Sequence, residues 1–203
     1  DDAGAERLLF MLDYTTYDSN SLVGPRAKVL QGPALVLASS KSLSDDDIKR
    51  IQALGASHKT TDFPSVGRFG VGINTMYHMS DAPVLFANNT LHVFDPLQAV
   101  VANGTRVGAQ YRVDKLRDEG FSDMLTPFAG LSDQWPTIFR LPLRCESSSK
   151  WRHALKVWSD VREVDSMLRE FAEAMDVEER LVLAKHVRKV EFVDVVVELY
   201  NVA

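Results

Sequence analysis

Residues 67–73 read GRFGVGI, which is the glycine spacing G-x-x-G-x-G followed by an apolar residue. The segment lies between a polar, aperiodic stretch (residues 56–66) and Ile73, Met76 and Tyr77, which fall at helical spacing. Glycines let successive backbone N–H groups turn toward one point and let a ligand approach the backbone closely. A helix that starts there adds free N–H groups and the positive end of its dipole. The pattern predicts a site for phosphate oxygens, and a tight turn without a ligand fits the spacing equally well.

The composition is that of a globular protein. The 203 residues are 45% hydrophobic and 25% charged, and they suffice for one large domain with its own core. A formal net charge of −5 gives no electrostatic footprint for nucleic acid or an anionic membrane. No apolar run approaches the roughly 20 residues that span a bilayer, and the single cysteine, Cys145, fits a reducing compartment. We expect an intracellular, cytoplasmic protein without nucleic-acid or membrane partners.

The rest of the sequence predicts a sheet with few helices. Strands are expected over residues 7–14, 34–38, 84–86, 91–94, 138–143 and 190–199. One helix should follow Ser44, because Asp47 stands at the capping-box spacing, and should end near Gly55. A second follows the apolar face from Val161 to Met175. Because strands outnumber helices and do not alternate with them, an α+β fold with a mostly antiparallel sheet is favoured over a doubly wound parallel one.

Several stretches along the chain resemble the repeats of sacsin, a family within the GHKL (Bergerat-fold) ATPase superfamily. Residues 66–83, VGRFGVGINTMYHMSDAP, are similar to the sacsin pattern G-x-F-G-x-G-F-N-S-V-Y-H-x-T-D-x-P. The glycine part also resembles the phosphate loop GQFGVGF of the ninety-kilodalton heat-shock chaperones. Further resemblances lie in order along the chain: QGPAL at 31–35, FDP at 94–96, FRLPLR at 139–144 and KHVRKVE at 185–191.

This resemblance implies a fold. It is a two-layer Bergerat-type sandwich, in which helices pack on one face of a mostly antiparallel sheet. The ATPase core would occupy residues 1–146 and be truncated at its N-terminus. Residues 147–203 would add a C-terminal helix and strand to the same domain.

The resemblance also implies a function, that of an ATP- or ADP-binding module in a chaperone-related protein. A magnesium ion would bridge the nucleotide phosphates. Other protein domains or chaperone clients would be further partners. The residues that the resemblance implies in nucleotide binding are Asp2, Ser40, Lys59, Gly67, Arg68, Phe69, Gly70, Val71, Gly72 and Thr137.

The chain departs from the family pattern at its first motif, E-x-x-x-N-A-D-D-A-x-A. In the family, the Glu polarises the attacking water and the Asn binds magnesium. The chain opens with Asp1-Asp2, so both residues would precede residue 1. We therefore expect ATP hydrolysis to be weakened or lost in this chain, and we assign no catalytic residue and no protein ligand to a metal.

A second departure concerns the base. The family places an aspartate after the central strand, where it accepts a hydrogen bond from the adenine amino group, but this chain has Ser39-Ser40 there. A serine hydroxyl is uncharged and both donates and accepts, so a charge-assisted bond is lost. The alternative hypothesis is therefore a non-enzymatic protein-interaction scaffold that keeps the fold without binding nucleotide. A histidine-kinase catalytic domain would share the fold but matches the motifs less well.

Overall fold

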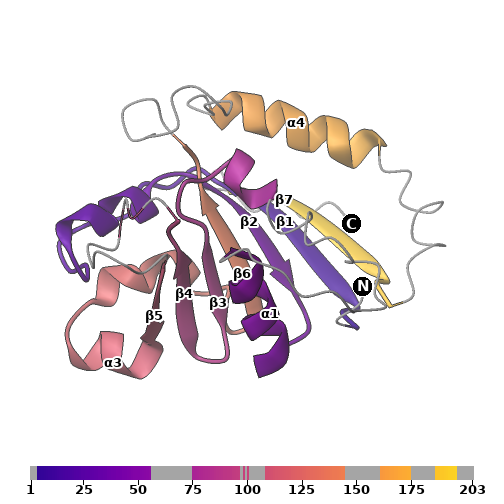
Figure 1. The fold of residues 1–203 in the computed structure, drawn as a ribbon. Coiled ribbons are helices and arrows are strands. Elements are labelled where there is room, and N and C mark those ends of the chain that lie inside the picture. Colours follow the sequence, from indigo (N-terminus) through magenta and orange to yellow (C-terminus); the bar gives the residue numbers. More distant parts are fainter. Residues whose placement is uncertain are drawn as a thin grey trace.

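The computed structural model of the protein describes residues 4–55, 75–96, 98, 100, 108–144, 161–174 and 186–195. Within them, seven strands form one sheet in the order β5-β4-β3-β6-β2-β1-β7 (Figure 1). The strands are β1 (Arg7–Asp13), β2 (Ala34–Ser39), β3 (Val84–Ala87), β4 (Thr90–Phe94), β5 (Gly108–Arg112), β6 (Thr137–Pro142) and β7 (Lys189–Val195). The helical elements are η1 (Pro25–Gln31), α1 (Asp45–Gly55), η2 (Thr75–His78), α3 (Val113–Asp118), η3 (Ser122–Met124), η4 (Thr126–Phe128) and α4 (Val161–Ala174).

The strand pairing confirms the predicted α+β fold with a mostly antiparallel sheet. Every neighbouring pair is antiparallel except β1 and β7, which run parallel from Arg7 opposite Lys189 to Asp13 opposite Val195. The apolar run of β2 lies between β1 and β6, as expected of a buried central strand. Pro142 marks the end of β6, where its missing N–H group disturbs the ladder least.

The sheet is covered on both faces. On one, the α1/α4 face, Leu35 and Leu141 pack with Ile48 of α1 and with Val164 and Leu168 of α4. On the other, the η1/α3 face, a second cluster includes these residues: Leu9, Val36, Ala38, Leu30 of η1, Leu116 of α3, Met124 of η3 and Phe128 of η4. The expectation that helices pack on one face only is therefore wrong. Leu35, Val36 and Leu37 follow one another in β2, so both faces of this strand are apolar and both need cover.

Helix α1 begins and ends where the sequence predicts. The backbone N–H of Asp47 donates to Ser44 Oγ, and the N–H of Ser44 donates to Asp47 Oδ2, each over 3.2 Å. This reciprocal pair is a capping box and satisfies N–H groups that lack a partner within the helix. The turn between β3 and β4 also matches the sequence, because Asn88 and Asn89 take positive φ angles of 49° and 56°.

The C-terminal part of the chain completes the same sheet and core. Strand β7 extends the sheet beyond β1, and Val164 of α4 is fully buried against the sheet. Figure 1 shows α4 and α3 on opposite sides of the strands. None of the helices in the described part of the chain is both long and apolar enough to cross a bilayer.

Candidate functional site

The structure describes Ser40 and Thr137 among the residues predicted to bind nucleotide. The others lie outside the described residues: Asp2, Lys59, Gly67, Arg68, Phe69, Gly70, Val71 and Gly72. The predicted phosphate site therefore stays a prediction. The geometry that follows concerns the part of the candidate site formed by the ends of β2 and β6.

Ser40 and Thr137 lie at the same end of the central strand pair. Thr137 begins β6 and lies directly opposite Ser39, the last residue of β2, and Ser40 follows at once. Thr137 also faces Ala87 at the end of β3. We call Ser39, Ser40 and Thr137 the hydroxyl cluster. The sheet thus gathers three hydroxyl groups from two strands at the end where the chain leaves β2 toward α1.

Each oxygen of the hydroxyl cluster already contacts the backbone. Thr137 Oγ1 donates to the carbonyl oxygen of Lys41 over 2.8 Å. Ser40 Oγ accepts from the backbone N–H of Arg7 over 3.0 Å, and Ser39 Oγ accepts from that of Lys41 over 3.2 Å. These bonds fix the cluster to β1 and to the segment that leads to α1, so its oxygens are positioned before any ligand arrives.

The cluster keeps unused hydrogen-bonding capacity. A hydroxyl has one donor proton and two acceptor lone pairs. Thr137 uses its proton and is only 2% exposed, so its lone pairs are buried. The partly exposed Ser40 uses one lone pair, and no acceptor for its proton is found among the described residues. The proton of Ser39 has a long 3.5 Å contact to the carbonyl oxygen of Lys41. By strand alternation, Ser39 and Thr137 lie on the α1/α4 face, whereas Ser40 is tied to the backbone of β1.

The turn after β3 connects this end of the sheet to α1. The side-chain amide of Asn88 donates to the carbonyl oxygen of Leu43 over 3.1 Å and to Asp45 Oδ1 over 3.3 Å. Asn88 follows β3, which pairs with β6 at Thr137, and Asp45 is the first residue of α1. The ends of β2, β3 and β6 and the start of α1 therefore form one connected corner.

Arg7 and Glu191, two charged residues near this corner, form an ion pair with each other. The Arg7 guanidinium stacks over the ring of Trp135 at 4.7 Å and forms an ion pair with Glu191 at 2.8 Å. Partial burial acts to raise the pKa of Glu191, but hydrogen bonds from Arg7 and Lys189 outweigh it and leave that pKa below its ordinary value. Arg7 therefore serves to join β1, β7 and the segment before β6.

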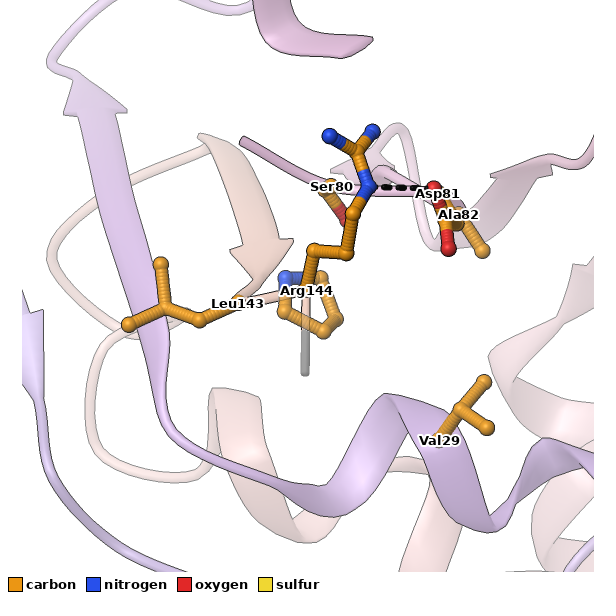
Figure 2. A pocket seen from close by; sticks show the side chains of 7 residues that line it. Val29, Ser80, Asp81, Ala82, Leu143 and Arg144 are labelled. Atoms are coloured by element: carbon orange, nitrogen blue, oxygen red, sulfur yellow. Dashed lines mark hydrogen bonds and ion pairs between the residues drawn. The ribbon is translucent and has the colours of Figure 1, made fainter. Parts of the chain in front are cut away.

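A small pocket lies at the opposite end of β6, away from the hydroxyl cluster (Figure 2). Its volume is about 30 Å³, and its lining is Val29, Ser80, Asp81, Ala82, Pro142, Leu143 and Arg144. Arg144 Nε donates to Asp81 Oδ1 over 2.6 Å, and the other nitrogens of its guanidinium donate to the carbonyl oxygens of His78 and Tyr77. Such a space holds about one water molecule, so this pocket cannot admit a nucleotide.

Arg140 is a second buried arginine that the sequence analysis did not single out. Its Nη2 donates to Asp13 Oδ2 over 3.2 Å and to the carbonyl oxygen of Gly32 over 2.6 Å, and both charged side chains are 1% exposed. The Tyr17 hydroxyl donates to the same carboxylate over 3.0 Å. Burial, and to a lesser extent the negative charge of Asp13, raise the pKa of Tyr17 above its ordinary value. An arginine between Phe139 and Leu141 in an otherwise apolar strand could have indicated a buried, paired charge from the sequence alone.

The described residues contain no group of three His, Cys, Asp or Glu side chains able to hold a metal ion. The hydroxyl cluster is neutral and is therefore a poor match for a cation. It offers one hydroxyl proton and several lone pairs, whereas Mg²⁺ prefers carboxylate and phosphate oxygens.

Comparison with known proteins identifies the family of the chain. The family model of the Sacsin domain matches residues 1–199. The human protein Sacsin is 32% identical over an alignment of 161 residues, which covers 73% of this chain and 4% of the human protein. The chain therefore spans a small part of the length of this relative. Since the family model matches almost the whole sequence, the chain belongs to the Sacsin domain family.

Proposed function

We propose that this chain is an ATP- or ADP-binding module of a sacsin-like, chaperone-related protein, with ATP hydrolysis weakened or lost. The observation that carries the proposal is the hydroxyl cluster, whose oxygens are held by backbone bonds at one end of β2 and β6, and in which the Ser40 proton has no acceptor among the described residues. Prearranged donors and acceptors at a corner of a sheet suit the polar edge of a base.

Each part of the nucleotide would have its own partners. Ser40, which is partly exposed, would donate to a ring nitrogen or oxygen of the base, whereas the buried Thr137 would hold the end of β6 to Lys41 beside it. The glycine segment at residues 67–72 is predicted to hold the phosphates through backbone N–H groups. A bound magnesium ion would neutralise part of the phosphate charge and keep several of its waters. Nucleotide binding would be read out by other domains of the parent protein or by its clients.

Calorimetric titration and thermal unfolding with ATP and ADP, each with magnesium, test the proposal. A ligand at a hundredfold its dissociation constant stabilises the folded state by about 2.7 kcal/mol. Ser40→Ala removes the partly exposed hydroxyl and should weaken nucleotide binding by about tenfold, the equivalent of one hydrogen bond. Ser166→Ala is the matched control, because the Ser166 hydroxyl bonds Glu170 on the exposed face of α4, away from the cluster.

A non-enzymatic interaction scaffold is the second candidate. The bonds of the hydroxyl cluster also fit this scaffold. Every oxygen of the cluster already has a backbone partner, and none carries a charge that would attract a ligand. In that case millimolar ATP or ADP would leave the thermal transition of the folded protein unchanged. A saturable heat of binding with ATP would exclude the scaffold.

A further inference from the structure

We infer that the small pocket beyond the C-terminal end of β6 binds one water molecule, which bridges the Ser80 hydroxyl and the Asp81 carboxylate. The inference goes beyond the proposed function and does not depend on it, because the pocket lies away from the hydroxyl cluster. Three observations carry it: a buried hydroxyl without a partner, a cavity of matching size, and a carboxylate oxygen that can still accept hydrogen bonds.

Ser80 carries the hydroxyl without a partner. The residue is fully buried, and its Oγ atom has no hydrogen-bond partner among the described residues. Its backbone N–H group donates to the carbonyl oxygen of Met76 over 3.0 Å, so the turn that ends η2 holds this residue in place. A hydroxyl that is buried without a partner loses its bonds to water on folding and regains none, which is unfavourable. A water molecule inside the protein supplies the missing bond.

The pocket has the size of one water molecule. Ser80, Asp81 and Arg144 line it together with apolar residues that include Val29 and Leu143 (Figure 2). Its volume of about 30 Å³ exceeds the roughly 10–15 Å³ that one water molecule requires. Val29 is 40% exposed, so the pocket has a route to solvent. A polar site of this size and with this access is suited to water and too small for an organic ligand.

Asp81 supplies the second partner of the water. Its Oδ1 atom accepts from Arg144 Nε over 2.6 Å, and none of the described residues donates to its Oδ2 atom. An ionised carboxylate accepts about four hydrogen bonds, so Oδ2 can accept from a water molecule. Because Ser80 and Asp81 are neighbours in the sequence and line the same pocket, one water molecule can accept from the hydroxyl and donate to the carboxylate.

The bound water would strengthen the contact between η2 and the end of β6. Arg144 follows β6 and donates to the carbonyl oxygens of Tyr77 and His78 in η2, as well as to Asp81. A water molecule that binds Oδ2 of Asp81 helps to keep Oδ1 directed toward Arg144. Ser80 and Asp81 therefore act as positioning residues for Arg144, and the water joins them.

A crystal structure of the full 203-residue chain, at a resolution that shows ordered water, tests the inference directly. We expect one water molecule in the pocket, at about 2.5–3.0 Å from both Ser80 Oγ and Asp81 Oδ2. A pocket without water overturns the inference. So does a Ser80 hydroxyl that bonds a protein group instead, or a water molecule that contacts only one of the two side chains.

Urea-induced unfolding of Ser80→Ala gives a second readout in solution. The substitution removes one partner of the water and should raise the equilibrium constant of unfolding by about fivefold, the equivalent of one hydrogen bond. Ser132→Ala is the matched control, because the Ser132 hydroxyl lies on a half-buried turn and has no partner among the described residues, so its removal should leave that constant unchanged. If the pocket is dry, Ser80→Ala removes an unpaired buried hydroxyl, and the protein becomes no less stable or even more stable. That result would contradict the inference, whether or not the protein binds nucleotide.

Discussion

The two ends of strand β6 bury different kinds of polar group. Toward and beyond its C-terminal end, Arg140 and Arg144 are buried as charged groups, each held by a carboxylate and by backbone carbonyl oxygens. At its N-terminal end, Thr137 belongs to a cluster of neutral hydroxyl groups with capacity left over. The bonds of the arginine end join charged groups, and Arg140 Nε is left buried without a partner among the described residues, whereas the bonds of the hydroxyl end are all neutral. Loss of a charged bond at the arginine end should therefore cost more stability than loss of a neutral bond at the hydroxyl end.

The largest expected effect comes from removing the charge of Arg140. Arg140→Met leaves Asp13 buried as an unpaired carboxylate, which should lower the free energy of unfolding by about 3–5 kcal/mol. Urea-induced unfolding measures this loss. The exposed Arg112–Asp114 pair offers a control, and Arg112→Met should leave stability unchanged.

A double variant sharpens that result. Arg140→Met combined with Asp13→Leu removes both charges, so no unpaired carboxylate remains and much of the lost stability should return. A double variant as unstable as Arg140→Met alone would show that the bonds of Arg140 to Leu30 and Gly32, rather than its pairing with Asp13, hold this end of the sheet.

Removal of the second arginine should have a smaller effect. Arg144→Met deprives the carbonyl oxygens of Tyr77 and His78 of their donor, but Asp81 is 12% exposed and can turn to water. We expect a loss of about 2–3 kcal/mol in the free energy of unfolding, typical of a hydrogen-bonded charged group. A loss equal to that of Arg140→Met would mean that solvent access to Asp81 gives no relief.

At the hydroxyl end, the expected loss of stability is smaller again. Thr137→Val removes one neutral hydrogen bond to the carbonyl oxygen of Lys41 and should cost about 1 kcal/mol in chemical unfolding. If Thr137→Val lowers the free energy of unfolding as much as Arg140→Met does, the two ends of β6 do not differ in how much they stabilise the fold.

The smallest effect concerns pH and a polar group on the α1/α4 face. His92 lies beneath α1, where its Nδ1 is 3.1 Å from the side-chain nitrogen of Gln52, and burial lowers its pKa below the ordinary value of 6.5. The unfolded chain therefore takes up a proton below pH 6.5 before the folded protein does, so stability falls as the pH drops through that value. Below the folded pKa the loss levels off.

His92→Gln should remove that contribution. The stability of the variant should depend less steeply on pH between pH 7 and pH 5 than that of the unchanged chain, as measured by urea unfolding at several pH values. The other histidines are present in both proteins, so the difference between the two slopes isolates His92. Equal slopes would show that the buried ring takes up its proton as readily as it does in the unfolded chain.

The sequence predicted most of the elements that have a strong local signal. The alternation and apolar runs located β1, β2, β3, β4 and β6 to within two residues, and the capping pair Ser44 and Asp47 located α1. Strand β5 and helix α3 were not predicted. In β5 the residues Gly108, Gln110 and Arg112 show little apolar character, and the strand is held by its pairing with β4 rather than by its own composition.

The sequence proposed residues for the candidate site but could not predict the bonds that Ser40 and Thr137 make. The resemblance to the family pointed to Ser40 and Thr137, and the strand register then brought them to one corner. The contacts of their hydroxyls with Arg7 and Lys41 depend on how three strands end in space, which no local pattern encodes. The buried pair of Arg140 and Asp13 joins residues 127 positions apart, and a single sequence gives no signal for such a partner.

The parallel pairing of β1 with β7 has a consequence for how the protein is made. The ion pair between Arg7 and Glu191 joins residues 184 positions apart, so β1 leaves the ribosome long before its partner strand β7. During synthesis the outer edge of β1 has no permanent neighbour, and unpaired strand edges recruit other chains. This domain should therefore reach its native state only after translation of residue 195, and slowing elongation would lengthen the period in which it is open to aggregation.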